Sequence, residues 1–193
     1  AFAPQIAIQA HARFEILPFH LHEPTGLARD PDTGDLFVSD TARGAIWKVE
    51  RDRHGNLKSQ TGYDTTFTAN TLCLDSIFVA HPILEGADGI ALDRAGNIWI
   101  DANERNAVAV VTKNGRVAEV FRNSPDSVTQ LRNTGPLEFP TSPVLSGKTF
   151  CTANADFERR DNFPNTDGEV TPAAPPRAKI SCMDQELIIP GLR

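Results

Sequence analysis

Short stretches in which apolar and polar residues alternate recur along the chain, and two groups of them follow the same order. In each group an apolar run ends at an aspartate, a tight turn follows, and an alternating strand comes next, which is typical of a β-hairpin. The first group spans residues 24–30, 31–34 and 36–40, and the second spans residues 87–93, 94–97 and 98–101. Each group adds a third apolar run, at residues 45–49 or 107–111, and a turn before a fourth strand. Four strands joined by short turns make one blade of a β-propeller.

A weaker third copy begins at residues 139–144, with further strands expected at 148–154 and 178–183. The chain is therefore expected to be a single partial propeller domain over residues 1–193, with blades at 23–62, 85–124 and 139–190. The copies are spaced more widely than the ~40 to 45 residues of a compact blade, so insertions are expected at 62–84 and 155–177. Long helical periodicity is absent from the sequence, which favours an all-β fold of four-stranded antiparallel blades.

Three blades do not close a ring, and an open propeller leaves sheet edges with unpaired backbone groups. Either the remaining blades lie on polypeptide upstream of this chain, or a second chain completes the ring, for example a second copy. We favour the interpretation that the sequence is a fragment of a larger propeller.

Composition narrows the classes of partner. The chain of 193 residues has 19 basic and 25 acidic residues, a net charge of −6, and its basic residues form no cluster that would follow a phosphate backbone. Nucleic acid is therefore not an expected partner. The apolar stretches are far shorter than the roughly 20 residues that cross a bilayer, so no membrane span is expected. A soluble protein is expected, and the sequence leaves open whether it is cytoplasmic or exported.

Residues 85–99, which read EGADGIALDRAGNIW, resemble a blade of the SMP-30/gluconolactonase family, and residues 24–40 resemble the blade before it. The resemblance covers roughly residues 23–154 and concerns the later blades. It implies a six-bladed ring with a divalent cation, often calcium, on the central axis. Asp88 matches the family's aspartate ligand, which in lactonases is also the general base, and Thr25 stands where the family commonly has an asparagine ligand. The family's early glutamate ligand would lie upstream of this chain.

The blade openings place Thr25, Asp88 and Thr141 at equivalent positions, so a closed ring would bring them to one mouth of the central channel. A carboxylate there could bind a hard cation, which could polarise a lactone carbonyl or acidify a water molecule. Structural alternatives remain for each residue. Asp88 could cap the turn before Gly89, Thr25 could bond to its own turn, and the prolines around Thr141 suggest a rigidly packed loop.

Other polar residues are weaker candidates for the pocket. Asn103 and Asn154 follow the second strands of their blades and could reach the channel mouth, although turn residues explain them adequately. His22, which alternates with His20, could line the pocket or simply lie on a polar strand face. Asp40 and Asp101 also recur after the second strands, and Asx turns are the favoured interpretation for both.

Three further expectations concern a disulfide, the second insertion and the two tryptophans. Cys151 and Cys182 are expected on adjacent antiparallel strands, where a disulfide between them would close off the insertion at 155–177. That insertion is interpreted as a lid over the propeller mouth. Trp47 and Trp99 are expected to pack inside their blades.

Two functions from different classes remain. The first is metal-supported hydrolysis of a small lactone or ester, with Asp88 binding the cation and activating water. The second is a noncatalytic propeller that binds a small molecule or a protein at its mouth, with Thr25 marking a lost metal site. The substrate and the identity of the metal cannot be deduced from the sequence.

Overall fold

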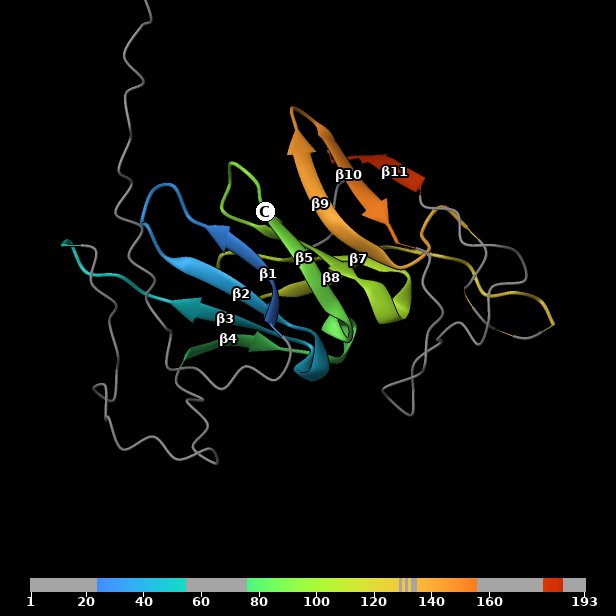
Figure 1. Cartoon of the computed structure of the whole chain (residues 1–193), viewed down its shortest axis with the longest axis horizontal. Coiled ribbons are helices and arrows are strands. Elements are labelled where there is room, and N and C mark those ends of the chain that lie inside the picture. The colour runs from blue at the N-terminus through green and yellow to red at the C-terminus, as the bar shows by residue number, and fades with distance from the viewer. Residues whose placement is uncertain are drawn as a thin grey trace, which may run out of the picture.

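Three antiparallel sheets make up the part of the chain that the computed structural model describes, residues 24–54, 76–128, 130, 132, 135–155 and 179–185 (Figure 1). The strands are β1 (Pro24–Arg29), β2 (Leu36–Asp40), β3 (Ala45–Val49), β4 (Ile77–Ala80), β5 (Ala87–Leu92), β6 (Ile98–Ala102), β7 (Ala107–Val111), β8 (Val117–Arg122), β9 (Pro140–Ser146), β10 (Thr149–Asn154) and β11 (Lys179–Asp184). Short 3₁₀ turns, η1 (Thr41–Arg43), η3 (Pro82–Leu84) and η4 (Asn103–Arg105), are the helical elements of the described residues. The fold is all-β, as the sequence predicted.

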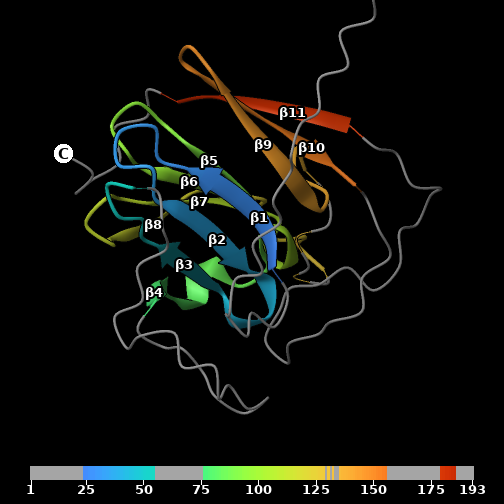
Figure 2. The same ribbon diagram turned by 60° about the vertical axis from the view of Figure 1, so that its left-hand side comes forward.

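The sheets have the strand orders β1-β2-β3-β4, β5-β6-β7-β8 and β11-β10-β9. The first strands of the three sheets lie next to one another, because β1 contacts β5 and β5 contacts β9 (Figures 1 and 2). The later strands of each sheet lead away from this inner row. This is the arrangement of consecutive blades in part of a β-propeller.

The fourth strand of the first blade differs from the sequence-based expectation. We expected it directly after the turn at residues 54–56, but β4 pairs with β3 from within residues 62–84, the stretch predicted to be an insertion. The apolar run of β4 lets Phe78 pack edge-on against the ring of Phe37, with 5.5 Å between ring centroids. Residues 55–75 lie outside the described part of the chain. The second blade has its four strands where the sequence indicated, and the third has β9, β10 and β11 close to the expected ranges.

Aspartate-based turns explain why the first two hairpins repeat. In the first hairpin, Asp30 Oδ1 accepts the backbone N–H of Asp32 at 2.8 Å and that of Thr33 at 3.2 Å. In the second, Asp93 Oδ1 accepts the backbone N–H groups of Ala95 and Asn97, each at 2.9 Å. An aspartate that bonds to the backbone two residues on stabilises a tight turn. Each of these aspartates therefore fixes the return of the chain into the second strand.

Apolar side chains join neighbouring blades. Trp99 and Phe150 bring blades two and three together, with 5.4 Å between their ring centroids, and both side chains are buried. Trp47 is 1% exposed within the first blade, so the predicted packing of both tryptophans is confirmed. The core between blades one and two consists of Phe37, Ile46, Leu84, Ala87, Ile90, Ile98, Ile100, Ala109 and Val111. The core between blades two and three consists of Trp99, Val108, Val110, Leu137 and Phe150.

A disulfide joins Cys151 to Cys182, which face each other across β10 and β11. The sequence left this bond open as one possibility, and the structure contains it. Residues 156–178 between the two strands lie outside the described part of the chain, so the lid predicted there stays a prediction. No helix among the described residues is long and apolar enough to cross a membrane.

Candidate functional site

The strand pairing confirms that Thr25, Asp88 and Thr141 occupy equivalent positions. Each follows the first residue of an inner strand, and those first residues pair with the last residue of the neighbouring strand, as Pro24↔Asp40, Ala87↔Ala102 and Pro140↔Asn154. Because the inner strands β1, β5 and β9 lie side by side, the three side chains come from the same level of the inner row. The repeat therefore places them at one end of the row of inner strands.

The inner strands approach each other closely beside these residues. A Cβ atom added to Gly89 would lie 2.2 Å from the carbonyl oxygen of Thr141, and one added to Gly26 would lie 2.3 Å from the carbonyl oxygen of Asp88. Both distances are shorter than real Cβ contacts, so a side chain at either position would force the strands apart. Glycine after Thr25 and Asp88 thus keeps the three blade openings together.

Asp88 and Asn103 form a direct pair. Asn103 Nδ2 donates a hydrogen bond to Asp88 Oδ2 at 3.0 Å, and the Asn103 side chain is buried. Burial raises the pKa of Asp88, whereas hydrogen bonds from Asn103 and Thr25 lower it, and burial is the largest of these effects. A carboxylate with a raised pKa is a stronger base than an exposed aspartate. The pairing brings together two of the residues that the sequence proposed for the site.

The Thr25 hydroxyl links the first two blades. It lies 2.9 Å from Thr41 Oγ1 and 3.3 Å from Ser39 Oγ, and it donates to the carbonyl oxygen of Ala87 at 3.1 Å. Ser39 Oγ also donates to the carbonyl oxygen of Asp88. The bond across to β5 differs from the alternative in which Thr25 bonds to its own turn. It fixes the start of β5, and with it the backbone of Asp88, against the first blade.

Asp101, which the sequence analysis assigned to an Asx turn, belongs to the group of polar residues around Asp88. Its side chain is 0% exposed, and Oδ2 accepts a hydrogen bond from the Thr152 hydroxyl of the third blade at 2.6 Å. Burial raises the pKa of Asp101 to about 8; the Thr152 bond opposes this rise and the charge of Asp88 adds to it. Asp101 Oδ1 is buried without a hydrogen-bond partner among the described residues. Asp101 is therefore a buried acid beside the site, and the turn assignment was wrong.

The turn assignment holds for Asp40. Its Oδ1 accepts the backbone N–H of Arg43 at 3.2 Å, and its Oδ2 forms an ion pair with the Arg43 guanidinium at 2.9 Å. The two aspartates were expected at matched places, but Asp40 pairs with Ala45 whereas Asp101 pairs with Val108, one position further from the turn. The register aligns Asp101 with Ser39.

Thr141, Asn154 and His22 are the remaining residues that the sequence proposed for the site. Thr141 is half-buried at the mouth, and its hydroxyl donates to the carbonyl oxygen of Ala153 at 3.3 Å. Asn154 is buried and structural, because Oδ1 accepts the backbone N–H of Glu138 at 2.8 Å and Nδ2 donates to Ser181 Oγ at 3.0 Å. The hydrogen bonds of Asn154 therefore join residues around the third blade. His22 lies outside the described residues.

The oxygen donors of Asp88 and Thr25 are of the type that a hard cation binds. They are too few to complete its coordination shell. Calcium takes about 6 to 8 oxygen ligands, and carboxylates are its usual protein partners. Asp88 offers a carboxylate and the neighbouring Thr25 a hydroxyl, which match that preference. No group of three or more His, Cys, Asp or Glu that could hold a metal occurs in the described ranges. Further ligands would have to come from other residues or from water.

Comparison with known families gives one match. Residues 5–150 match the model of the SMP-30/Gluconolactonase/LRE-like region, which covers most of the chain. No curated protein matches the chain in sequence.

Several solved structures resemble the chain at low identity. They include regucalcin from Agrobacterium tumefaciens, described as a calcium-binding protein, with 20% identity over 72% of this chain and 40% of that one and a TM-score of 0.47. A gluconolactonase from Xanthomonas campestris has 11% identity over 72% of this chain and 37% of that one, with a TM-score of 0.45. A streptogramin B lyase has 16% identity over 70% of this chain and 35% of that one, with a TM-score of 0.41. The chain thus spans well under half the length of these proteins.

Proposed function

Because the chain belongs to the SMP-30/gluconolactonase/LRE-like family, we propose that it carries part of the site of a metal-supported hydrolase that opens small lactones or related esters. The single observation that supports this most is the Asp88 carboxylate, which lies at the mouth of the inner strand row and is oriented by the buried Asn103 at 3.0 Å. A carboxylate so oriented can accept a proton from an attacking water molecule.

In this proposal Asp88 and Thr25 would contribute oxygens to a divalent cation, and their hard donor atoms favour calcium. When bound, such a cation supplies polarisation of the lactone carbonyl and lowers the pKa of a coordinated water molecule. The chain's own residues supply the rest. Asn103 fixes the rotamer of Asp88, and the contacts of Thr25 and Ser39 with β5 fix its backbone.

The raised pKa of Asp88 sets the expected pH dependence of cation binding. Burial raises this pKa above the ordinary value of 3.8, so the carboxylate becomes protonated at a higher pH than an exposed aspartate. A protonated Asp88 can neither accept a proton nor bind a cation. The affinity of the cation-free protein for a divalent cation should therefore fall as the pH drops through the raised pKa of this residue.

A noncatalytic propeller that binds a ligand at its mouth is the second candidate. It is favoured by Thr25, whose hydroxyl already donates to the carbonyl oxygen of Ala87 and lies against Thr41, where a family member would present an amide oxygen. Loss of that ligand would weaken the binding of a cation and leave the mouth as a binding surface.

A matched pair of variants separates the two candidates. We expect Asp88→Asn to reduce kcat/KM for δ-gluconolactone hydrolysis at least about 10²-fold in the presence of calcium, because it removes the base. Asp32→Asn, in an exposed turn, is the control and should retain full activity. If the assembly that contains the wild-type chain accelerates lactone opening no more than buffer does, or if Asp88→Asn is as active as the wild type, the hydrolase proposal is wrong and the binding function becomes the better account.

A further inference from the structure

The disulfide of the third blade lies outside the candidate site. It joins Cys151 and Cys182, which face each other directly across β10 and β11. Side chains alternate along a strand, so Cys151 lies on the other side of β10 from Thr152, whose hydroxyl bonds to Asp101. The disulfide therefore faces away from blade two and from the polar residues of the site.

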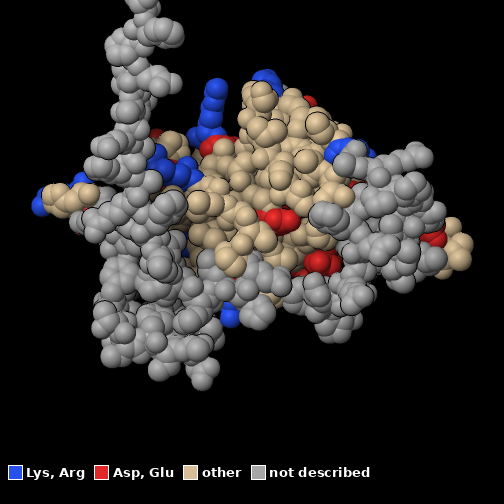
Figure 3. Space-filling view, in the orientation of Figure 1, with Lys and Arg blue, Asp and Glu red and all other residues tan. Residues whose placement is uncertain are grey.

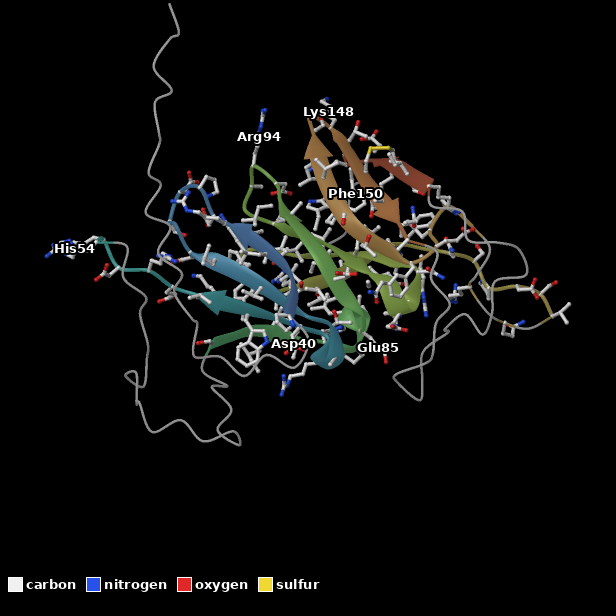
Figure 4. All side chains as sticks on the ribbon, in the orientation of Figure 1. Asp40, His54, Glu85, Arg94, Lys148 and Phe150 are labelled. Atoms are coloured by element: carbon white, nitrogen blue, oxygen red, sulfur yellow. A yellow bond between two sulfur atoms is a disulfide. The ribbon has the colours of Figure 1, made fainter. Side chains whose placement is uncertain are left out.

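Solvent reaches the disulfide. Cys182 is exposed and Cys151 is half-buried, and Val144, which pairs with Cys151 on β9, is exposed as well. Figure 4 shows the bond in yellow at the outer part of the third blade, near the labelled Lys148. Exposed disulfides have more oxidising potentials than buried structural ones and are the labile or regulatory kind. A thiol reductant can therefore approach Cys182.

The position of β11 at an edge of its sheet makes the disulfide important for holding this strand. Among the described strands, β11 pairs with β10 alone. Polar contacts add to this pairing, since Ser181 Oγ accepts a hydrogen bond from Asn154 Nδ2 at 3.0 Å and Lys179 forms an ion pair with Glu138 at 2.9 Å. The two cysteines are 31 residues apart in sequence, and a disulfide that closes a loop of this length strongly favours the closed state.

On its other side, β11 forms one wall of a small hollow between blades two and three. The hollow has a volume of about 70 Å³, well below the ~300 to 1,000 Å³ of small-molecule sites. Ser181, Cys182 and Met183 of β11 line it. The apolar residues that line it from β7, β8, β10 and the segment before β9 are Val108, Phe121, Phe150 and Leu137. Separation of β11 from β10 would therefore expose apolar side chains of the core.

We propose that the Cys151–Cys182 disulfide is a redox-sensitive switch: a dithiol reductant opens it in the folded protein, and β11 then separates from β10 and uncovers the apolar hollow. A thiolate of the dithiol attacks the exposed Cys182 sulfur, the S–S bond breaks, and Cys151 leaves as a thiolate that takes up a proton. The second thiol of the reductant then displaces Cys182 and closes the reductant's own disulfide. The protein gains two electrons and two protons, and the dithiol loses them.

The switch operates while the Val144 side of the sheet is open, because polypeptide packed on this side would shield the sulfur atoms. Oxidation thus fixes β11 in the sheet before another element covers it. The exchange needs no chemistry at Asp88. A failure of lactone hydrolysis would leave the switch unaffected, and the two proposals can be tested separately.

The test treats the folded 193-residue chain with dithiothreitol in the absence of denaturant. We expect N-ethylmaleimide to label Cys151 and Cys182 after this treatment. The backbone amides of β11 should then exchange with deuterium at least about 10-fold faster, because the loss of a disulfide lowers the local stability of the strand that it holds. The amides of β5 to β8 should keep their exchange rates, and reoxidation should restore slow exchange in β11.

Cys73→Ser is the matched control, since it removes the third cysteine of the chain and should respond to dithiothreitol as the wild type does. The double variant Cys151→Ser/Cys182→Ser should show fast exchange in β11 with and without dithiothreitol. Labelling of the two cysteines only in the presence of urea would overturn the proposal, and so would unchanged exchange of β11 in the reduced chain. Equal loss of protection in β5 to β8 would overturn it as well, because the disulfide would then hold the whole fold.

Discussion

At the scale of single residues, the site depends on a buried carboxyl group that does not face solvent. Asp101 interacts electrostatically with Asp88 and accepts a hydrogen bond from Thr152 of the next blade. Burying an unpaired carboxylate costs free energy, so such a group usually takes up a proton. With a pKa of about 8, Asp101 is mostly protonated at neutral pH.

The raised pKa of Asp101 predicts a stability that depends on pH. The folded protein holds this proton up to about pH 8, whereas the unfolded chain loses it near the ordinary value of 3.8. The group's contribution is therefore fully present below about pH 4 and decreases as the pH rises towards 8, by up to about 1.4 kcal/mol per pH unit. Asp101→Asn, which cannot titrate, should show a weaker decline and become the more stable protein at pH 9.

Urea unfolding of wild type, Asp101→Asn and Asp32→Asn between pH 5 and pH 9 measures this effect. The exposed Asp32 variant should follow the wild type at every pH. Parallel profiles for wild type and Asp101→Asn would mean that the Asp101 carboxyl group is not buried as described.

The sequence predicted Asp88 and Asn103 as site residues but assigned Asp101 to a turn, because the two blade copies were aligned incorrectly. A comparison of the two copies by eye matches the aspartate that ends each apolar run and so aligns Asp40 with Asp101, although Asp40 is the last residue of β2 and Asp101 is the residue before the last of β6. The strand pairing shows that Asp40 aligns with Ala102 and Asp101 with Ser39. Counting back from the matched third strands would have revealed this. The bond from Asp101 to Thr152 could not be predicted, because it joins residues of different blades.

At the scale of elements, the contact between inner strands is the feature that positions the site. Asp88 and Thr141 come from different sheets, and only the close approach of β5 to β9 brings their backbones together. The repeat in the sequence predicted the equivalence of these strands. It could not predict β4, since an apolar run such as that of β4 contains no signal that it pairs with β3 across an intervening segment.

Gly89→Ala tests the contact between β5 and β9. Because the added Cβ would meet the carbonyl oxygen of Thr141 at 2.2 Å, the strands must separate, and we expect a loss of about 1 to 3 kcal/mol in the free energy of unfolding. The comparison is Gly147→Ala, where an added Cβ meets nothing within 4 Å and only its left-handed backbone opposes alanine, at a cost of about 1 kcal/mol. Urea unfolding of both variants gives the difference. A Gly89→Ala protein as stable as the wild type would contradict the close packing of the inner strands.

At the scale of the whole molecule, the third blade exposes an apolar face. Val144 on β9 and Ile180 on β11 are 57% and 76% exposed, and the register puts both on the same side of the sheet as Cys151 and Ala153. The opposite side packs on blade two through Phe150. Exposed apolar faces of this kind mark surfaces that other protein covers. We propose that a further blade, on a second copy of the chain or on other polypeptide, packs there.

Charged side chains of both signs lie on the surface of the described residues, and the partners expected from composition stay a prediction. On the face turned towards the viewer in Figure 3, acidic and basic side chains lie in separate small patches among other residues. The net charge of −6 adds no attraction for nucleic acid.

Native mass spectrometry with metal analysis tests the central claim, that the chain contributes to a closed propeller with a cation at Asp88. The wild type, with calcium, should be recorded as an assembly larger than the 21.1 kDa chain, with about one bound calcium per ring. Asp88→Asn should keep the same assembly and lose the calcium. A single 21.1 kDa chain without metal, unchanged by Asp88→Asn, would contradict both the closed ring and the metal-supported site.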